Sequence, residues 1–401
     1  MIMTSHTISK VFHLSKPPPL SLYIHIPWCV RKCPYCDFNS HKIQGKIPEN
    51  DYISALLADL EQDLRFVWGR TIRSIFIGGG TPSVLSPDAI DRLLSGIRAR
   101  LSIMVGAEIT LEANPGTIDN GRLQGFREAG INRLSLGIQS FSDSALQHLG
   151  RIHGSIEAIN AIEAARKAGF NTINLDLMFG LPAQTIETAL EDLRQAVAFE
   201  PAHLSWYQLT IEPNTLFYHH SPPLPDDDLL WEMQTAGQKY LAEQGYLQYE
   251  ISAYAFATQQ CQHNLNYWKF GDYLGIGAGA HGKISDARLG TITRLSKQCH
   301  PDSYLQRATT SAVIAHETKL TPPEVVIEFM MNALRLFEGF TEQEFIENTG
   351  INMACVEKPI QEAYAQGWLV KGKDEKGVSS RIRATETGIR FLNEVLGLFV
   401  P

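Results

Sequence analysis

Strand-like and helical segments alternate six times between residues 21 and 244. The strand-like segments are rich in apolar residues and end at turn residues, whereas the others repeat apolar residues at helical spacing. Such alternation favours a parallel sheet whose strands are joined by helical crossovers. The strand-like segments span residues 21–27, 73–77, 108–113, 133–138, 172–178 and 203–209, and the helical ones 51–68, 86–101, 119–129, 155–168, 185–199 and 226–244.

Six strand–helix units predict an α/β fold, an open (β/α)6 partial TIM-like barrel. In barrels of this kind the chemistry lies at the carboxyl ends of the strands. The first strand leads into Cys29, the second into residues 78–82 (Gly-Gly-Gly-Thr-Pro), and the third ends in Glu112. Because polar and glycine-rich residues collect at the end of every strand, the sequence predicts one functional site at this end of the barrel.

The repeat breaks after residue 225, where the long helical segment 226–244 completes the sixth unit, and we expect three parts in the chain. These are a lead-in over residues 1–19, a core with an extension over 20–290, and a smaller, mostly helical, winged-helix-like domain over 291–401. We expect a strand over 249–255, irregular structure to about residue 318, a helix over 323–337, a strand pair around 371–377 and a final helix near 387–398.

The charge balance argues against nucleic acid as a partner. Lysine and arginine number 35 and aspartate and glutamate 43, which gives a net charge of −8. Residues 320–401 are acidic as well, with eight basic and twelve acidic side chains. Phosphate binding requires a basic face, so a DNA-binding role for the winged-helix-like part is disfavoured.

No apolar run approaches the roughly 18–20 residues of a membrane span. Residues 1–20 lack the apolar core of a signal peptide, and they contain no acidic residue and no arginine. A targeting role for residues 1–19 stays open, but an extended lead-in fits Pro17-Pro18-Pro19 better. We expect a cytoplasmic protein.

Three of the six cysteines, Cys29, Cys33 and Cys36, form the pattern CxxxCxxC. In a long chain without a secretion signal, such a group favours a metal or redox site over a disulfide framework. Three thiolates suit an iron–sulfur cluster, and three ligands leave the fourth iron of a cubane free for a substrate. The alternative is a structural zinc site with His25 or His41 as the fourth ligand.

CxxxCxxC after the first strand, with Gly-Gly-Gly-Thr-Pro after the second, resembles the radical-SAM superfamily over roughly residues 20–290. The resemblance implies a [4Fe–4S] cluster on the three cysteines, with S-adenosylmethionine (SAM) chelating the free iron. It also implies an electron donor, because an electron from the cluster cleaves SAM in that superfamily.

The resemblance and the strand-end placement together imply a set of SAM contacts. Glycine lets the backbone approach the methionine amino group, carboxylates suit ribose hydroxyls or an ammonium, and arginine can bond the SAM carboxylate. Each residue alone has an ordinary alternative, such as a capping carboxylate, and their joint placement favours the SAM site. The expected contacts are Tyr23, Tyr35, Gly79, Gly80, Thr81, Glu112, Gln139, Arg151, Asp176 and Thr210.

Five motifs, at residues 23–27, 78–82, 112–115, 150–153 and 176–182, together resemble the coproporphyrinogen III dehydrogenase group. The oxygen-independent dehydrogenases of that group carry one more cysteine two residues after the third, where this chain has Phe38. The departure puts dehydrogenase activity in doubt. It points to the sister branch of heme chaperones, which is similar over essentially the full length, including the C-terminal HemN-like domain.

A second feature favours the same branch. Residues 263–268 match its HNxxYW signature, which implies heme contact through His263, Asn264, Tyr267 and Trp268. An imidazole can ligate heme iron, and aromatic faces pack on a flat macrocycle. The alternative is a core histidine beside a tryptophan. Cys261 and His281 are candidates for a second iron ligand.

Residues 277–282 satisfy GxGxxG, the dinucleotide-binding fingerprint. The fingerprint requires a helix directly after it, and residues 283–290 do not have a helical pattern. We therefore expect a close-packed turn near the functional site.

The leading hypothesis is a heme carrier that delivers heme to membrane respiratory enzymes, with cluster and SAM supporting transfer and without dehydrogenase activity. Membrane association would come through these clients, and a homodimer stays open. The runner-up is oxidative decarboxylation of coproporphyrinogen III to protoporphyrinogen IX. A third hypothesis is a zinc-stabilised winged-helix binding protein.

Overall fold

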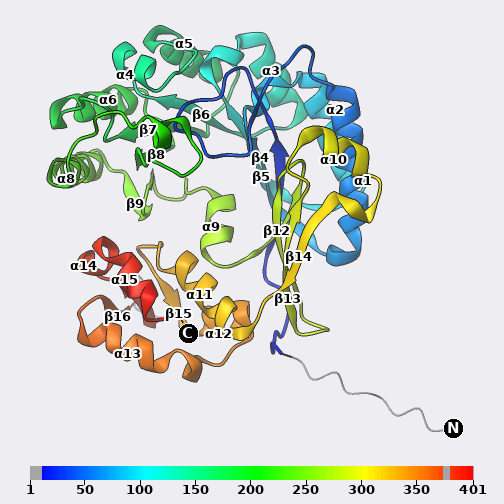
Figure 1. The fold of residues 1–401 in the computed structure, drawn as a ribbon, viewed down its shortest axis with the longest axis vertical. Coiled ribbons are helices and arrows are strands. Elements are labelled where there is room, and N and C mark those ends of the chain that lie inside the picture. Colours follow the sequence, from blue (N-terminus) through cyan, green and yellow to red (C-terminus); the bar gives the residue numbers. More distant parts are fainter. Residues whose placement is uncertain (1–10, 374–379, 401) are drawn as a thin grey trace.

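The computed structural model describes residues 11–373 and 380–400, and its largest element is an open sheet (Figure 1). The six predicted strands lie next to one another in this sheet, and all are parallel. The predicted α/β fold, an open partial barrel, is therefore confirmed. The strands are β1 (Leu20–Ile26), β4 (Thr71–Gly79), β5 (Ser102–Ala113), β6 (Arg133–Gln139), β7 (Ile173–Phe179) and β8 (His203–Gln208).

The crossover helices surround the outer face of this sheet (Figure 1). Alternate residues of β1 point to opposite sides, as the pleat of a strand requires. Leu22 and Ile24 are buried in one core with Leu56 and Leu60, whereas Ser21 hydrogen-bonds to a polar residue inside the barrel. The crossover helices include α1 (Glu49–Val67), α2 (Pro87–Arg98), α3 (Asn120–Ala129), α5 (Ser155–Lys167) and α6 (Ile186–Ala198). The other helices of this part of the chain are α4 (Asp143–His148), α7 (Leu216–His219) and α8 (Asp227–Glu243).

The expectation of irregular structure up to residue 318 is wrong. Strand β11 (Asp272–Ile276) pairs in parallel with β1, and β12 (His281–Asp286), β13 (Thr291–Lys297) and β14 (Ile314–Lys319) follow in antiparallel order. At the other edge, the predicted strand over 249–255 is a hairpin of β9 (Leu247–Glu250) and β10 (Ala253–Ala255). Helix α10 (Pro301–Arg307) lies between β13 and β14. The predicted boundary at residue 290 falls between β12 and β13, so the sheet crosses it.

Helix α9 (Gln262–Trp268) lies at the amino ends of the barrel strands, between the sheet and the C-terminal helices (Figure 1). Glu108 lies in β5, opposite Ser74 of β4. Its carboxylate accepts hydrogen bonds from the backbone N–H groups of Gln262 and His263. An acidic side chain is favourable at the amino end of a helix. This contact fixes α9 at the end of the barrel opposite the cysteines.

The C-terminal part has its own hydrophobic core, formed mainly by residues from Leu320 onward and joined by Phe270 and Ile292. Phe12 and Leu14 of the lead-in are buried in it. The predicted final helix is two short helices, α14 (Glu386–Arg390) and α15 (Leu392–Gly397), and residues 374–377 of the predicted strand pair lie outside the described residues. The other elements are α11 (Pro322–Ala333), β15 (Phe340–Thr341), α12 (Glu342–Thr349), α13 (Glu357–Ala365), β16 (Leu369–Lys373) and β17 (Ser380–Ala384).

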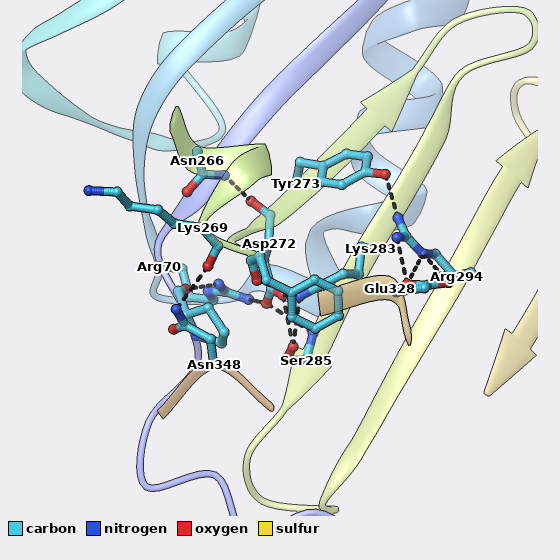
Figure 2. A network of polar contacts seen from close by, with 12 residues as sticks. Arg70, Asn266, Lys269, Asp272, Tyr273, Lys283, Ser285, Arg294, Glu328 and Asn348 are labelled. Carbon is cyan, nitrogen blue, oxygen red and sulfur yellow. Dashed lines mark hydrogen bonds and ion pairs between the residues drawn. The ribbon is translucent and has the colours of Figure 1, made fainter. Parts of the chain in front are cut away.

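A polar network joins the barrel to this C-terminal part (Figure 2). The buried Asp272 carboxylate is paired with Arg70 at 2.8 Å and with Lys283 at 2.9 Å. Nearby, Arg294 of β13 forms an ion pair with Glu328 of α11 at 2.6 Å. Two cations satisfy the one buried carboxylate, which offsets the cost of removing it from water.

Among the described residues, no helix is long and apolar enough to cross a membrane.

Candidate SAM and cluster site

A cavity of about 530 Å³ opens at the carboxyl ends of the barrel strands. Its walls come from the cysteine loop, the glycine segment after β4, and the ends of β5 to β8. All of the predicted cluster and SAM residues except Tyr23 line it: Cys29, Cys33, Tyr35, Cys36, Gly79, Gly80, Thr81, Glu112, Gln139, Arg151, Asp176 and Thr210. The structure therefore brings together residues from six separate strand ends.

The cysteine loop is held at both ends. Short strands β2 (Trp28–Cys29) and β3 (His41–Lys42) pair with each other and close the loop. Each cysteine sulfur also has a polar neighbour. Thr81 Oγ1 lies 3.3 Å from the sulfur of Cys29, and Arg151 Nη1 lies 3.6 Å from that of Cys33. Donors of this kind stabilise negative charge on sulfur, as an iron–sulfur cluster requires.

The two histidines that the zinc alternative proposes as a fourth ligand are engaged in other contacts. The two ring nitrogens of His25 are within hydrogen-bonding distance of the Tyr23 hydroxyl, at 2.9 Å, and the Asn39 carbonyl, at 2.8 Å. Nε2 of His41 lies 3.3 Å from the Asn39 side chain. Within the described ranges, no three His, Cys, Asp or Glu side chains could hold a single metal ion. Three cysteines on the wall of a cavity instead fit a larger cluster with one open position.

The glycines after β4 are required by packing. A Cβ at Gly80 would lie 2.6 Å from the Trp28 carbonyl oxygen, and one at Gly79 would lie 2.6 Å from the His25 ring. Gly79 also has φ of +113°, which side chains disfavour. The glycines therefore let the end of β4 approach β1 and the cysteine loop, in addition to any approach to a ligand.

Two carboxyl groups face the cavity, Glu112 from β5 and Asp176 from β7, on either side of β6. Burial and the nearby Asp176 raise the pKa of Glu112 to about 8, and the backbone N–H of Gly79 donates to Glu112 at 3.2 Å. Burial also raises the pKa of Asp176, which accepts hydrogen bonds from Ser135 and Asn174. Paired carboxyl groups in a concave site suit hydroxyl groups or a cation.

Glu112→Gln should remove a pH dependence of stability. A carboxyl group whose pKa is raised on folding contributes stability below its unfolded pKa, and this contribution is lost as pH rises towards the folded value. Without added SAM, the wild-type melting temperature should therefore fall, relative to that of Glu112→Gln, as pH rises from 5 to 8.5. Thermal melts of both proteins across this range measure the difference. Parallel curves would contradict the assignment.

Gln139 and Arg151 are held in place by hydrogen bonds, and Gln139 also has an unusual backbone conformation. Gln139 has φ of +70°, an unusual value for a residue other than glycine, and such backbone strain is frequent at functional sites. Its side chain accepts a hydrogen bond from Tyr207 at 2.7 Å. Arg151 donates to the Gly137 carbonyl at 2.7 Å. Tyr207, Ser135 and Met178 also line the cavity and were not predicted. Period-two alternation from Gln139 and Asp176 points to Ser135 and Met178 but not to Tyr207.

The HNxxYW residues lie away from this cavity. His263 is 3% exposed, its ring stacks on Phe76 at 5.0 Å, and its Nδ1 lies 3.1 Å from the Ser74 hydroxyl. Its Nε2 is buried and has no hydrogen-bond partner among the described residues. Burial lowers the His263 pKa to about 3. The ring is a core imidazole here, and a heme iron would reach it only if α9 left the barrel.

The other residues of the motif contribute to packing. Tyr267 lies against Tyr273, with ring centroids 4.2 Å apart. The Arg335 guanidinium stacks on Trp268 at 4.5 Å, which connects α9 to the C-terminal part. Asn264 is partly exposed on the same helix. Of the candidate second iron ligands, Cys261 is buried beside Glu108, and His281 is exposed after β11.

The GxGxxG segment is a close-packed turn beside the cysteine loop. A Cβ at Gly277 would lie 2.4 Å from the His25 carbonyl oxygen, and Gly277 has φ of +105°. The Asn39 side-chain amide, just after the cysteines, donates to the Ala278 carbonyl at 2.9 Å. The turn therefore supports the loop that contains the cluster cysteines.

Comparisons with known proteins agree with this geometry. Residues 23–196 match the Radical SAM superfamily. The chain is 51% identical over 385 residues to the heme chaperone HemW of Escherichia coli K12, covering 96% of this chain and 99% of the relative. It is also 51% identical over 391 residues to HemW of Haemophilus influenzae, with the same coverage. The E. coli coproporphyrinogen III oxidase HemN, a radical SAM enzyme, has the same fold, with a TM-score of 0.79 at 22% identity over 96% of this chain and 90% of that one.

An open parallel barrel with three cysteines after its first strand and glycines after its second defines the class, and the chain is a radical-SAM protein. Membership in that superfamily implies a [4Fe–4S] cluster and SAM. Within the superfamily, the chain is 51% identical to a heme chaperone over nearly its full length, whereas it is 22% identical to the HemN enzyme. The chain belongs to the HemW family of heme chaperones.

Proposed function

We propose that this chain is a cytoplasmic protein that binds heme and delivers it to membrane respiratory enzymes. The observation that supports this best is the near-full-length identity of 51% to heme chaperones. Phe38 supports it as well, since it lies at the rim of the cavity where the dehydrogenase group has a further cysteine. The protein would therefore act as a carrier and would not primarily convert a porphyrin.

Cys29, Cys33 and Cys36 would hold the [4Fe–4S] cluster, and the cavity beside them would hold SAM. Reduced cluster supplies one-electron chemistry when bound, which requires an external electron donor. Arg151 is suited to the SAM carboxylate, because its guanidinium lies beside the Cys33 sulfur. Glu112 and Asp176 would accept hydrogen bonds from ribose hydroxyls or the methionine ammonium.

Tyr23 would act through a neighbour and not through SAM itself. Its hydroxyl lies 2.9 Å from Nδ1 of His25, whose Nε2 lies 2.8 Å from the Asn39 carbonyl oxygen just after the cysteines. This chain of contacts would keep the far end of the cysteine loop against β1. Tyr23→Phe should therefore weaken cluster retention more than SAM affinity in protein that still contains the cluster.

The function is tested on anaerobically purified protein by heme titration and by a porphyrin assay. We expect roughly one heme per chain, transfer of that heme to respiratory membranes, and no protoporphyrinogen from coproporphyrinogen III. A purified protein with an intact cluster that never binds heme would exclude the carrier role. Protoporphyrinogen formation at enzymatic rates would favour the dehydrogenase instead. Gel filtration with and without heme tests whether a homodimer forms.

A further inference from the structure

The burial of His263 raises the question of which accessible imidazole could meet a heme iron. Two histidines, His219 and His220, are adjacent in sequence and exposed at the end of α7. Helix α7 directly follows the segment after β8, which contributes Thr210 and Glu212 to the cavity wall. The imidazole pair therefore lies at the cluster end of the barrel, whereas His263 lies at the opposite end.

Helix α7 is attached to the cysteine loop itself. The backbone N–H of Phe217 donates to the Pro34 carbonyl at 3.0 Å. The buried Phe217 ring also packs on Tyr35, with centroids 6.4 Å apart. Pro34 and Tyr35 lie between the second and third cluster cysteines, so α7 is fixed relative to the cluster.

Two of the exposed side chains of α7 are apolar or aromatic. Leu216 is 63% exposed and Tyr218 56% exposed, and they flank the buried Phe217. Tyr218 also contacts His219, with ring centroids 5.6 Å apart. We call Leu216, Tyr218, His219 and His220 the α7 patch. Two exposed apolar side chains beside two exposed imidazoles bring together, at one place, surface for a flat apolar ring and ligands for a metal.

The cysteine loop adds further features of a heme site. Phe38 is 59% exposed and lines the cavity, and Val30 is also exposed. Arg31 lines the cavity, and the exposed Lys32 ammonium donates to the Phe38 carbonyl at 3.1 Å. These two cations offer partners for the two heme propionates, although Asp37 and Glu212 also line the cavity.

We propose that heme docks on the α7 patch, with His219 or His220 as an iron ligand and the macrocycle against Leu216, Tyr218 and the exposed face of the cysteine loop. The chemistry matches a flat apolar ring that has two carboxylates at one edge and an iron that accepts imidazole. This inference rests on the proposed heme-carrier function. It places the cargo at the mouth of the cavity that would hold SAM, so heme and SAM would influence each other's affinity.

The test compares three variants of the full chain with intact cluster: His219→Ala/His220→Ala, Leu216→Ser/Tyr218→Ser, and the control His316→Ala on exposed β14. Hemin titration is followed by the Soret band, together with iron and sulfide content. We expect at least tenfold weaker heme binding in the first two variants, a changed iron spectrum in the histidine variant, and wild-type behaviour in the control. The single variants His219→Ala and His220→Ala then identify the ligand.

Wild-type heme affinity and spectrum in the double histidine variant would overturn the α7 proposal and leave the heme-carrier function intact. Loss of heme binding in His263→Gln, at an unchanged melting temperature and with the α7 variants unaffected, would overturn it in favour of the HNxxYW helix. By contrast, a wild-type protein with intact cluster that binds no heme would refute the proposed function itself.

Discussion

Cys33→Ala should yield a colourless protein, whereas the wild type purified without oxygen should be brown and contain about four irons per chain. Three thiolates hold the expected cluster, and the structure offers no further cysteine on the cavity wall to replace a lost one. Iron and sulfide analysis and the visible absorption spectrum measure the loss. SAM affinity should fall with it, because the open iron would be its main ligand.

Cys355→Ala is the matched control, since Cys355 is an exposed free cysteine in the C-terminal part. It should keep wild-type iron content and heme affinity. A Cys33→Ala protein that retains a full complement of iron and sulfide would contradict the assignment of the cluster to this loop. Equal iron loss in both variants would point to general instability and not to a ligand role.

The strand ends of the barrel could be predicted because local sequence determines them. Cys29, Gly79 and Glu112 each follow or end an apolar strand, and Asp176 interrupts one; parallel strands bring such residues to one end of the barrel. Tyr207 was missed because it lies inside a strand, where an aromatic residue resembles core. Its exposure to the cavity depends on which face of β8 points into the barrel, and that is decided by tertiary packing.

The strands β11 to β13 were missed for a different reason. They contain Asp272, Lys283 and Lys297, charged residues that a sequence pattern assigns to the surface and that the structure buries. Their charges are compensated by partners far away in sequence, such as Arg70 for Asp272. The HNxxYW motif shows the same limit, because the motif itself does not tell at which end of the barrel its helix lies.

A buried charge cluster joins β13 to α1. Lys297 of β13 forms ion pairs with Asp59 at 2.5 Å and with Asp63 at 2.7 Å, both on α1, and all three side chains are inaccessible to solvent. Asp59 also accepts hydrogen bonds from the Tyr304 hydroxyl and from the backbone N–H of Gly277. Through Gly277, the cluster supports the turn that packs against the cysteine loop.

Lys297→Met should destabilise the protein by about 3–5 kcal/mol, because it leaves two buried carboxylates without a counter-charge. Burial already raises the pKa of Asp63 to about 6, and removing the lysine should raise it further. The deficit in melting temperature should therefore be larger at pH 8 than at pH 5.5, where protonation relieves the unpaired charge. Lys319→Met, at an exposed position on β14, is the control and should melt like the wild type.

Adding Asp63→Asn to Lys297→Met should restore part of the lost stability, since only one buried carboxylate then remains unpaired. Thermal and urea unfolding of the single and double variants measure this coupling. An additive loss in the double variant would show that the ion pairs do not interact as the structure implies. Because Asp59 holds Gly277 in place, the unrescued variant should also lose cluster iron faster than the wild type on exposure to a chelator, and the double variant should lose it at an intermediate rate.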